Sequence, residues 1–172
     1  SFASSGGNAW IMADEGSGTP DVTTTALYRD VSAWYHFVFV WDTGNDTSSE
    51  RIRLYVNGLR ITSFSAANYP SADQDSIAFN TTGTVHRWCQ HVVGGSGGAV
   101  YLAECIMLDG TAGTAATFGE FNSDGVWIPT DPSSLTFGDE GFWLDFEDSS
   151  DLGNDVSGNG NDWTSVSMSA SN

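Results

Sequence analysis

The sequence contains no lysine, and its basic residues are five arginines: Arg29, Arg51, Arg53, Arg60 and Arg87. The 22 aspartates and glutamates bring the formal net charge to −17 at pH 7. Nucleic acids and anionic membrane surfaces attract proteins largely through Lys and Arg, so this composition argues against both as partners. Divalent cations are a more natural counter-charge, although solubility accounts for most of the acidic residues.

Cysteines and long apolar runs are also scarce. Cys89 and Cys105 are the only cysteines, and the absence of a CxxC pair or a His cluster argues against a zinc site. The two cysteines can form a disulfide or remain buried thiols. No apolar run is long enough to cross a bilayer, so membrane insertion is not expected. Because the chain starts at Ser1 and not at Met, we expect a mature product, a processed piece or part of something longer.

Turn-forming and aromatic residues are abundant. The chain has 20 glycines among many Ser, Thr, Asn and Asp residues, and 13% of its residues are aromatic, including seven tryptophans. This mixture is typical of short strands joined by tight turns. With 40% hydrophobic residues, a chain of 172 residues can form one domain with its own core, spanning residues 1–172.

The clearest local pattern is a β-hairpin. Residues 51–56 alternate between apolar and polar side chains, and Asn57-Gly58 follows before a return strand over residues 59–64. An Asn-Gly pair between two such runs favours a tight turn, because both turn residues must tolerate positive φ. Residues 34–41 are mostly aromatic and β-branched, and they predict a central strand buried on both faces.

Weaker strand patterns occur along the rest of the chain, at residues 9–13, 25–29, 76–79, 85–92, 100–108, 141–147 and 163–168. Residues 114–121 are the only segment that predicts a helix, and it is short. Strands at this spacing without helical partners predict an all-β fold: a two-sheet antiparallel β-sandwich of the jelly-roll type.

Several of these runs resemble the LamG/pentraxin-like branch of the concanavalin A-like lectin/glucanase superfamily. The resemblance lies in residues 34–42 (WYHFVFVWD) with 53–58 (RLYVNG), and in residues 98–104 (GAVYLAE). Further runs are similar to LamG-like domains in proteins of marine bacteriophages, and they span residues 28–36, 118–129 and 141–164. The resemblance implies a jelly-roll domain of a virion surface protein, such as a tail fibre, a receptor-binding part or a capsid decoration.

One part of the family pattern is displaced in this chain. Many LamG domains carry a DSSGNGN-like segment just after their first strand, whereas this chain has its version at residues 155–161. We therefore expect a permuted arrangement in which residues 141–172 form a C-terminal strand-loop-strand segment, with an outer strand at residues 142–146. The alternative is that strands are missing here and come from an upstream segment or a neighbouring subunit.

The acidic residues do not predict catalysis. A retaining glycosidase needs two carboxyl groups about 5–5.5 Å apart, and Asp145 and Glu147 alternate as such a pair would on one strand. The catalytic E-x-D-x-(x)-E pattern of the superfamily is missing, so we interpret the pair as a polar strand edge and the chain as not an enzyme. Glu104 follows an apolar run and predicts a structural ion pair with His36 or an arginine.

Calcium is the candidate cofactor. Ca²⁺ takes about six to eight oxygen ligands, which loops rich in Asp and Asn can supply. The resemblance also implies calcium, because LamG and pentraxin relatives often bind it at a sandwich rim. The candidate ligands are Asp42, Asp46, Asp155, Ser157, Asn159 and Asn161. The alternative is that these residues only form Asx-turns, and one sequence leaves both open.

The tryptophans fall into two groups. Three lie in apolar strands and are expected in the core: Trp34, Trp41 and Trp143. Four lie near turns, where an indole face can stack on a sugar ring or pack into the core: Trp10, Trp88, Trp127 and Trp163.

Together these patterns predict a non-catalytic binding or display module on a virion or extracellular surface. Its partners would be a host-surface glycan, with calcium as a possible aid, and other virion or fibre subunits, with the chain itself in a homo-oligomer. One alternative is a purely structural capsid decoration or fibre subunit that makes only protein–protein contacts. A second is a degenerate glycoside hydrolase.

Overall fold

The computed structural model describes the backbone of residues 2–5 and 8–12, and residues 20–76, 86 and 100–170 with their side chains. By their internal contacts the residues divide into two compact units. Unit 1 comprises Ser1–Ala99 and Thr114–Thr130, and unit 2 comprises Val100–Gly113 and Asp131–Asn172. The single domain expected over residues 1–172 stays a prediction. Within the described part of the chain, no helix is both long and apolar enough to cross a membrane.

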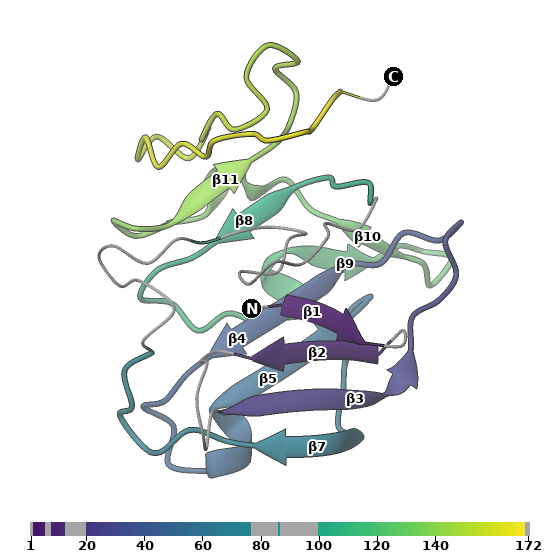
Figure 1. Ribbon diagram of the computed structural model, residues 1–172, viewed down its shortest axis with the longest axis vertical. Coiled ribbons are helices and arrows are strands. Elements are labelled where there is room, and N and C mark those ends of the chain that lie inside the picture. The colour runs from purple at the N-terminus through teal and green to yellow at the C-terminus, as the bar shows by residue number, and fades with distance from the viewer. Residues whose placement is uncertain (1, 6–7, 13–19, 77–85, 87–99, 171–172) are drawn as a thin grey trace. The chain divides into compact units, whose positions relative to one another are not determined.

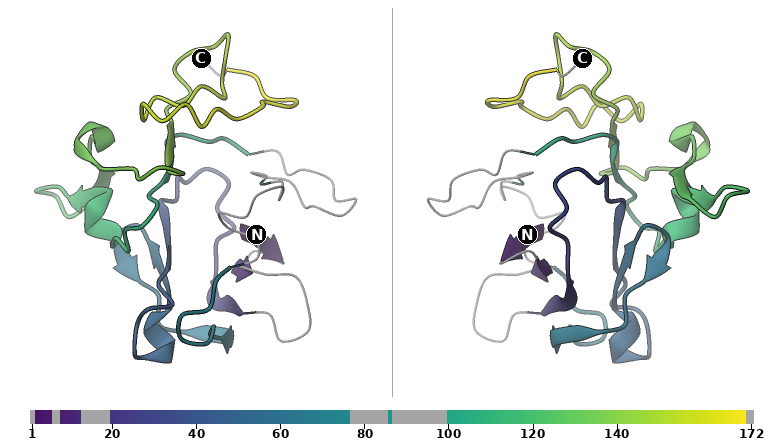
Figure 2. Two further views of the ribbon diagram at one scale, coloured as in Figure 1. Left: turned by 90° about the vertical axis from the view of Figure 1, so that its left-hand side faces the viewer. Right: turned by 90° about the vertical axis from the view of Figure 1, so that its right-hand side faces the viewer.

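Among its described residues, unit 1 contains two larger antiparallel sheets and a two-stranded hairpin (Figure 1). The first has the order β1-β2-β3-β7, formed by Phe2–Ser5, Asn8–Met12, Asp21–Leu27 and Phe64–Asn68. The second has the order β4-β5-β6, formed by Phe37–Trp41, Ile52–Val56 and Leu59–Arg60. Figure 2 shows these sheets as two separate layers. A small hairpin of β9 (Gly119–Phe121) and β10 (Trp127–Pro129) completes the unit's sheets, and 3-10 turns span Ser48–Glu50 (η1) and Ala115–Thr117 (η2).

The core of unit 1 lies between the two sheets. Val22 from β3 packs with Ile52 and Leu54 from β5, and all three are almost completely buried. The register places Phe39 opposite Leu54 and Trp41 opposite Ile52, so the aromatic side chains of β4 share the core face with the aliphatic ones of β5. Burying such side chains stabilises a fold by about 1.5–3 kcal/mol each.

The predicted Asn-Gly hairpin is confirmed. Asn57 and Gly58 have φ angles of 47° and 81°, as a turn with two left-handed residues requires. The return strand is shorter than expected, because β6 ends at Arg60. The chain then crosses to the other sheet, where the backbone N–H of Thr25 donates to the carbonyl of Ser63 at 3.2 Å and β7 pairs with β3.

Unit 2 contains a single ladder among its described residues. β8 (Cys105–Met107) pairs with β11 (Phe142–Leu144), and their buried side chains Cys105, Phe142 and Leu144 form its apolar cluster. A 3-10 turn, η3, spans Pro132–Ser134, and Asp131 caps it by accepting a hydrogen bond from the backbone N–H of Ser133 at 2.8 Å. The rest of the unit consists of turns and irregular segments.

The all-β antiparallel sandwich is confirmed, but several boundaries were wrong. The strand predicted over residues 34–41 begins only at β4, because the chain is still leaving a turn at residues 31–33; residues 34–36 therefore precede the strand. Residues 163–168 form no strand, since the Trp163 backbone N–H bonds to Gly153 instead. The segment 114–121, expected as a helix, is a 3-10 turn followed by β9. The strands expected at 100–108 and 141–147 shrink to β8 and β11. Those at 76–79 and 85–92 fall, except for residues 76 and 86, outside the described residues.

Candidate functional site

The candidate site lies in unit 1, at the end of the β4-β5-β6 sheet that carries the Asn57-Gly58 turn. The side-chain oxygen of Asn57 accepts a hydrogen bond from the backbone N–H of His36 at 2.8 Å. In return, the backbone N–H of Asn57 donates to the carbonyl of His36 at 2.9 Å. These bonds fix the backbone of His36, which directly follows Trp34 and Tyr35.

Trp127 of β10 packs onto this turn. Its indole N–H donates to Nδ1 of His36 at 2.9 Å, and the two rings stack with centroids 5.9 Å apart and an interplanar angle of 27°. A Cβ placed on Gly58 or on Gly119 would overlap the indole ring, so two glycines allow this close approach. Burial lowers the pKa of His36 below its ordinary value of 6.5, which favours the neutral ring that can accept the bond.

The turn between β9 and β10 is held by one side chain. The side-chain oxygen of Asn122 accepts hydrogen bonds from the backbone N–H groups of Asp124 at 3.0 Å and Val126 at 2.9 Å. Gly125 has a φ of 75°, which a residue with a side chain rarely adopts. The resulting hairpin places Phe121 directly opposite Trp127, where the two rings meet edge to face at 5.0 Å.

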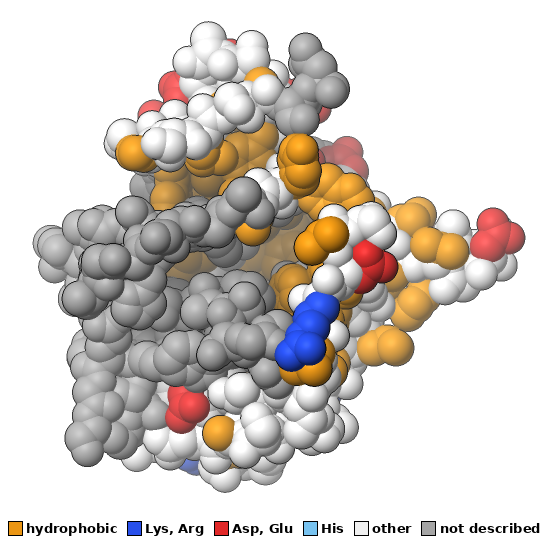
Figure 3. Space-filling view, turned by 45° about the vertical axis from the view of Figure 1, so that its right-hand side comes forward, with side chains coloured by type: hydrophobic (Ala, Val, Ile, Leu, Met, Phe, Trp, Pro, Cys, Tyr) orange, Lys and Arg blue, Asp and Glu red, His pale blue; other side chains and the backbone are white. Residues whose placement is uncertain are grey.

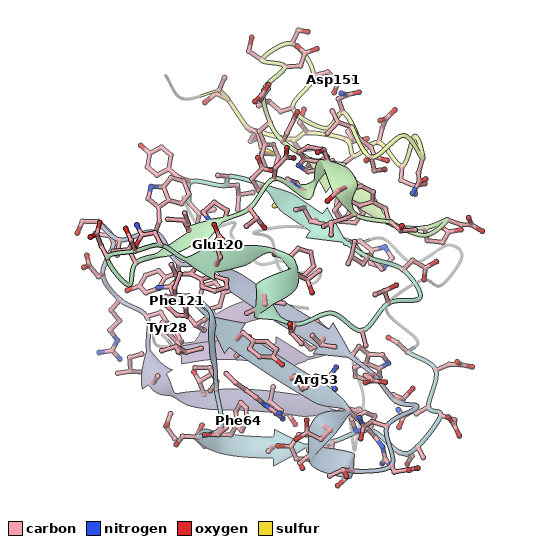
Figure 4. All side chains as sticks on the ribbon, turned by 180° about the vertical axis from the view of Figure 1, so that it is seen from behind. Tyr28, Arg53, Phe64, Glu120, Phe121 and Asp151 are labelled. Carbon is pink, nitrogen blue, oxygen red and sulfur yellow. The ribbon has the colours of Figure 1, made fainter. Side chains whose placement is uncertain are left out.

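Aromatic side chains gather at the same end of unit 1. Tyr28 meets Tyr35 and Phe37 edge to face, with centroids 5.4 and 5.3 Å apart. Trp34 and Phe121 keep 66% and 49% of their surface exposed. We call Tyr28, Trp34, Tyr35 and Phe121 the aromatic surface; Tyr28 and Phe121 are labelled in Figure 4. Figure 3 shows hydrophobic side chains exposed on one face of the molecule, with few charged side chains among them.

The four tryptophans predicted to stack on sugar rings lie in different surroundings. Trp127 is half-buried and anchored to His36. Trp163 is half-buried in unit 2, where its ring packs on Phe142 at 5.1 Å. For Trp10 only the backbone in β2 is described, and Trp88 lies outside the described residues. Of the expected core tryptophans, Trp41 packs against the core of unit 1 and Trp143 stacks on Phe137, but the prediction for Trp34 was wrong.

Residues 155–161 of unit 2 form a loop, called the Asp155 loop below, that is organised by hydrogen bonds within the protein. The buried carboxylate of Asp155 accepts from the backbone N–H groups of Trp143, Ser157 and Asn161 and from the Ser157 hydroxyl, at 2.8–2.9 Å. The side-chain amides of Asn159 and Asn161 donate to the carbonyl of Gly141 at 2.9 Å. A cation at this loop would compete with these donors, and calcium binding here stays a prediction.

The other calcium candidates also have protein partners. Asp42 forms a 3.1 Å ion pair with Arg53, and the backbone carbonyl of Asp46 accepts from Arg51 at 3.2 Å. Among the described residues, no group of three or more His, Cys, Asp or Glu side chains is placed to hold a metal ion. Asx-turns, the expected alternative, are frequent: a side-chain oxygen accepts from the backbone N–H two residues on at Asp30, Asn45, Asn122, Asp131, Asp145, Asp148, Asp151 and Asp155.

The acidic residues weighed for catalysis lie beyond the strands. β11 ends at Leu144, and Asp145 accepts from the backbone N–H of Glu147 at 3.1 Å, so the two do not alternate on a strand. Glu104 is exposed and accepts from the indole N–H of Trp143, so the expected ion pair was wrong. Its φ of 53° breaks the strand alternation just before β8. Desolvation raises the pKa of the Glu104 carboxyl, and the charges of Asp145 and Glu147 add to this rise although the indole bond lowers it.

The sequence did not identify the aromatic surface. Trp34 and Tyr35 were assigned to a buried strand because they continue the apolar run of β4. The Asp30 side chain, which accepts from the backbone N–H of Ser32 at 2.9 Å, marks the turn that separates them from β4. The Asp-x-Ser sequence before the aromatic run therefore indicates a turn, and it could have shown that Trp34 and Tyr35 lie outside the strand.

Comparisons with known proteins bear on this site. A laminin G family model, described as the concanavalin A-like lectin/glucanases superfamily, matches residues 1–88, just over half of the 172 residues. That range includes β1 to β7 and three of the four residues of the aromatic surface. The searches of curated proteins and of solved structures found no match. The chain belongs to the concanavalin A-like lectin/glucanases superfamily.

Proposed function

We propose that this chain is a non-catalytic carbohydrate-binding module displayed on a virion or other extracellular surface. One observation carries the proposal: a chain of the lectin/glucanases superfamily leaves Trp34 66% exposed, next in the chain to Tyr35, whose ring meets that of Tyr28. Exposed indole and phenyl faces suit the apolar C–H patches of a pyranose ring. The similarity of residues 28–36 and 118–129 to LamG-like domains of marine bacteriophage proteins supports the virion surface and a host glycan as ligand.

The packing beneath the aromatic surface favours binding. Phe37, which contacts Tyr28 and lies 6.0 Å from Tyr35, also packs against the core of unit 1. Burial raises the pKa of Tyr28 above its ordinary value, and the neighbouring Tyr35 adds to the rise. The rings of Tyr28 and Tyr35 are therefore held by the packed core, so these two side chains lose little conformational entropy when a ligand binds.

A glycan array with purified protein tests the proposal. We expect the wild type to bind a defined set of glycans, and Trp34→Ala and Phe121→Ala each to weaken binding about tenfold, which corresponds to about 1.4 kcal/mol. Tyr101→Ala is the matched control, because Tyr101 is an exposed aromatic residue of unit 2 with 75% of its surface accessible. Binding to no glycan, or an equal loss in the Tyr101 variant, would contradict the proposal.

Calcium enters the proposal as an optional aid. The same array with EDTA separates the two modes, because chelation abolishes binding that depends on calcium and leaves direct aromatic binding intact. If chelation abolishes binding, Asp42→Asn and Asp155→Asn show which loop supplies the ligand oxygens.

A structural role has one observation in its favour. Leu59, Val126 and Ile128 keep 63%, 56% and 36% of their surfaces exposed, and all three adjoin Gly58 or Trp127 in the chain. Exposed apolar side chains often mark protein–protein contacts. If the chain is a fibre or decoration subunit, Leu59→Glu will convert an oligomer to a smaller species in analytical ultracentrifugation, whereas a glycan-binding role leaves the sedimentation unchanged.

A further inference from the structure

We propose that the hydrogen bond between His36 and Trp127 is a pH-sensitive latch that holds the β9-β10 hairpin against the Asn57-Gly58 turn and so positions Phe121 in the aromatic surface. The part of this inference that concerns ligand affinity rests on the proposed function. The latch itself can be tested without any ligand.

The hydrogen bond exists in only one protonation state of the histidine. An indole N–H can only donate, so Nδ1 of His36 must carry a lone pair to accept it at 2.9 Å. The neutral ring then carries its proton on Nε2. Protonation places a second N–H on Nδ1, facing the N–H of Trp127, and the attraction becomes a repulsion.

The packing transmits this change to the hairpin. The indole of Trp127 lies so close to Gly58 and Gly119 that neither position has room for a Cβ. An indole confined in this way cannot tilt to relieve the repulsion without moving the strand that carries it. Trp127 pairs directly with Phe121 across the ladder, so displacement of β10 also displaces Phe121.

Burial is the dominant influence on the titration of His36. Among the described residues, the segments next to the Asn57-Gly58 turn carry four titratable side chains, and none of them contributes to the shift in the pKa of His36: Tyr35 on its own segment, Arg60 on β6, Glu120 on β9 and Asp124 in the β9-β10 turn. Arg60 pairs with Glu50 at 2.7 Å, and burial alone lowers the pKa of His36. No carboxylate charge of a described residue therefore contributes to the shift in the pKa of His36.

The sign of the pH dependence follows from that lowered pKa. As the pH falls, the histidine of the open or unfolded chain, with a pKa near 6.5, takes up a proton at a higher pH than the latched histidine does. The stabilisation by the latch is therefore complete above about pH 6.5 and is lost as the pH falls through the lower pKa of the latched ring.

Nitrogen-15 NMR of the full chain tests the latch directly. The indole N–H resonance of Trp127 is assigned by its absence in Trp127→Phe. Between pH 8 and pH 5 we expect this resonance to shift and its solvent exchange to accelerate, with a midpoint below 6.5. In His36→Asn, whose side-chain oxygen replaces Nδ1 as acceptor without titrating in this range, the resonance should not depend on pH. A wild-type resonance that stays unchanged to pH 5, or an equal change in His36→Asn, would overturn the latch.

The affinity for a glycan identified on the array provides the second readout. We expect the wild type to lose at least threefold in affinity between pH 7.5 and pH 5, and His36→Asn to lose none of it. If no glycan binds, the proposed function fails while the NMR titration still decides the latch. If a glycan binds with equal pH dependence in both proteins, the effect on the aromatic surface is contradicted and the proposed function remains.

Discussion

The two units are stabilised in different ways. Unit 1 has long ladders and a cluster of Val22, Ile52 and Leu54 that is almost completely removed from water. Unit 2 has one short ladder, and its turns converge on the buried carboxylate of Asp155. Apolar burial depends little on pH, whereas hydrogen bonds to a carboxylate depend on its charge. A buried acidic side chain therefore helps to hold unit 2 together, whereas the core of unit 1 depends on apolar side chains.

The chemistry of Asp155 makes this contrast measurable. Burial alone would raise the pKa of Asp155, but the hydrogen bonds from Trp143, Ser157 and Asn161 outweigh it and hold the pKa below its ordinary value of 3.8. A buried carboxylate of this kind stabilises the fold while it is ionised, and removing it leaves its donors unsatisfied. Among the described residues, every buried side-chain nitrogen and oxygen has a hydrogen-bond partner. Removal of the Asp155 carboxylate would therefore leave unsatisfied donors in a structure that otherwise satisfies its buried polar side chains.

The largest effect is expected for Leu54→Ala in unit 1. Leu54 is 0% exposed, so its truncation leaves a cavity and should destabilise unit 1 by about 3 kcal/mol. Hydrogen exchange of the β5 amides measures this loss. Leu59→Ala, at a position that is 63% exposed, is the control and should change stability by less than about 0.5 kcal/mol. Equal effects of the two variants would refute the assignment of the core.

A smaller effect is expected for Asp155→Ala in unit 2, at about 2–3 kcal/mol, because several donors lose their acceptor at once. The amide of Trp143, which donates to Asp155 at 2.8 Å, should exchange much faster with solvent. Asp151→Ala is the control, since the exposed Asp151 accepts from the Gly153 backbone N–H at 3.2 Å. If unit 1 amides lose as much protection as those of unit 2, the contrast between the units fails.

The smallest effect is the acid response of Asp155. Since its pKa is lowered on folding, its contribution is complete above about pH 3.8 and is lost as the pH falls through the lower, folded value. A protonated carboxyl still accepts through its carbonyl oxygen, so the loss is smaller than that in Asp155→Ala. Protection of the Trp143 amide in acid reports it, and Asp155→Asn should lose this part of the pH dependence. Persistence of the same dependence in that variant would assign it to another group.

The sequence was a good guide where a pattern repeats and a poor one where a single contact decides. Alternation located β5, and the Asn-Gly pair located its turn, because both depend on local chemistry. The end of β6 was not predictable, since after Ile61, which still bonds to Leu54 of β5, the chain leaves this sheet to reach a partner, β3, about forty residues earlier in the chain. The site was missed for the same reason, as His36 and Trp127 are 91 residues apart.

For the Asp155 loop the sequence suggested two roles and could not decide between them. Its Asp, Ser and Asn residues are the types that bind calcium, and the sequence left calcium and Asx-turns open. In the structure the carboxylate oxygens of Asp155 accept hydrogen bonds from nearby backbone groups, and the side-chain amides of Asn159 and Asn161 donate to the Gly141 carbonyl. Composition identifies the available oxygens, but only the backbone geometry shows where they point.

The crossover after β6 has a consequence for how unit 1 assembles. Arg60 ends a strand of one sheet and Phe64 begins a strand of the other, so three residues join the layers. A tether this short costs little loop-closure entropy. Once the β5-β6 hairpin has formed, β7 is tethered by these three residues to the β4-β5-β6 sheet, which keeps the two layers close at this point.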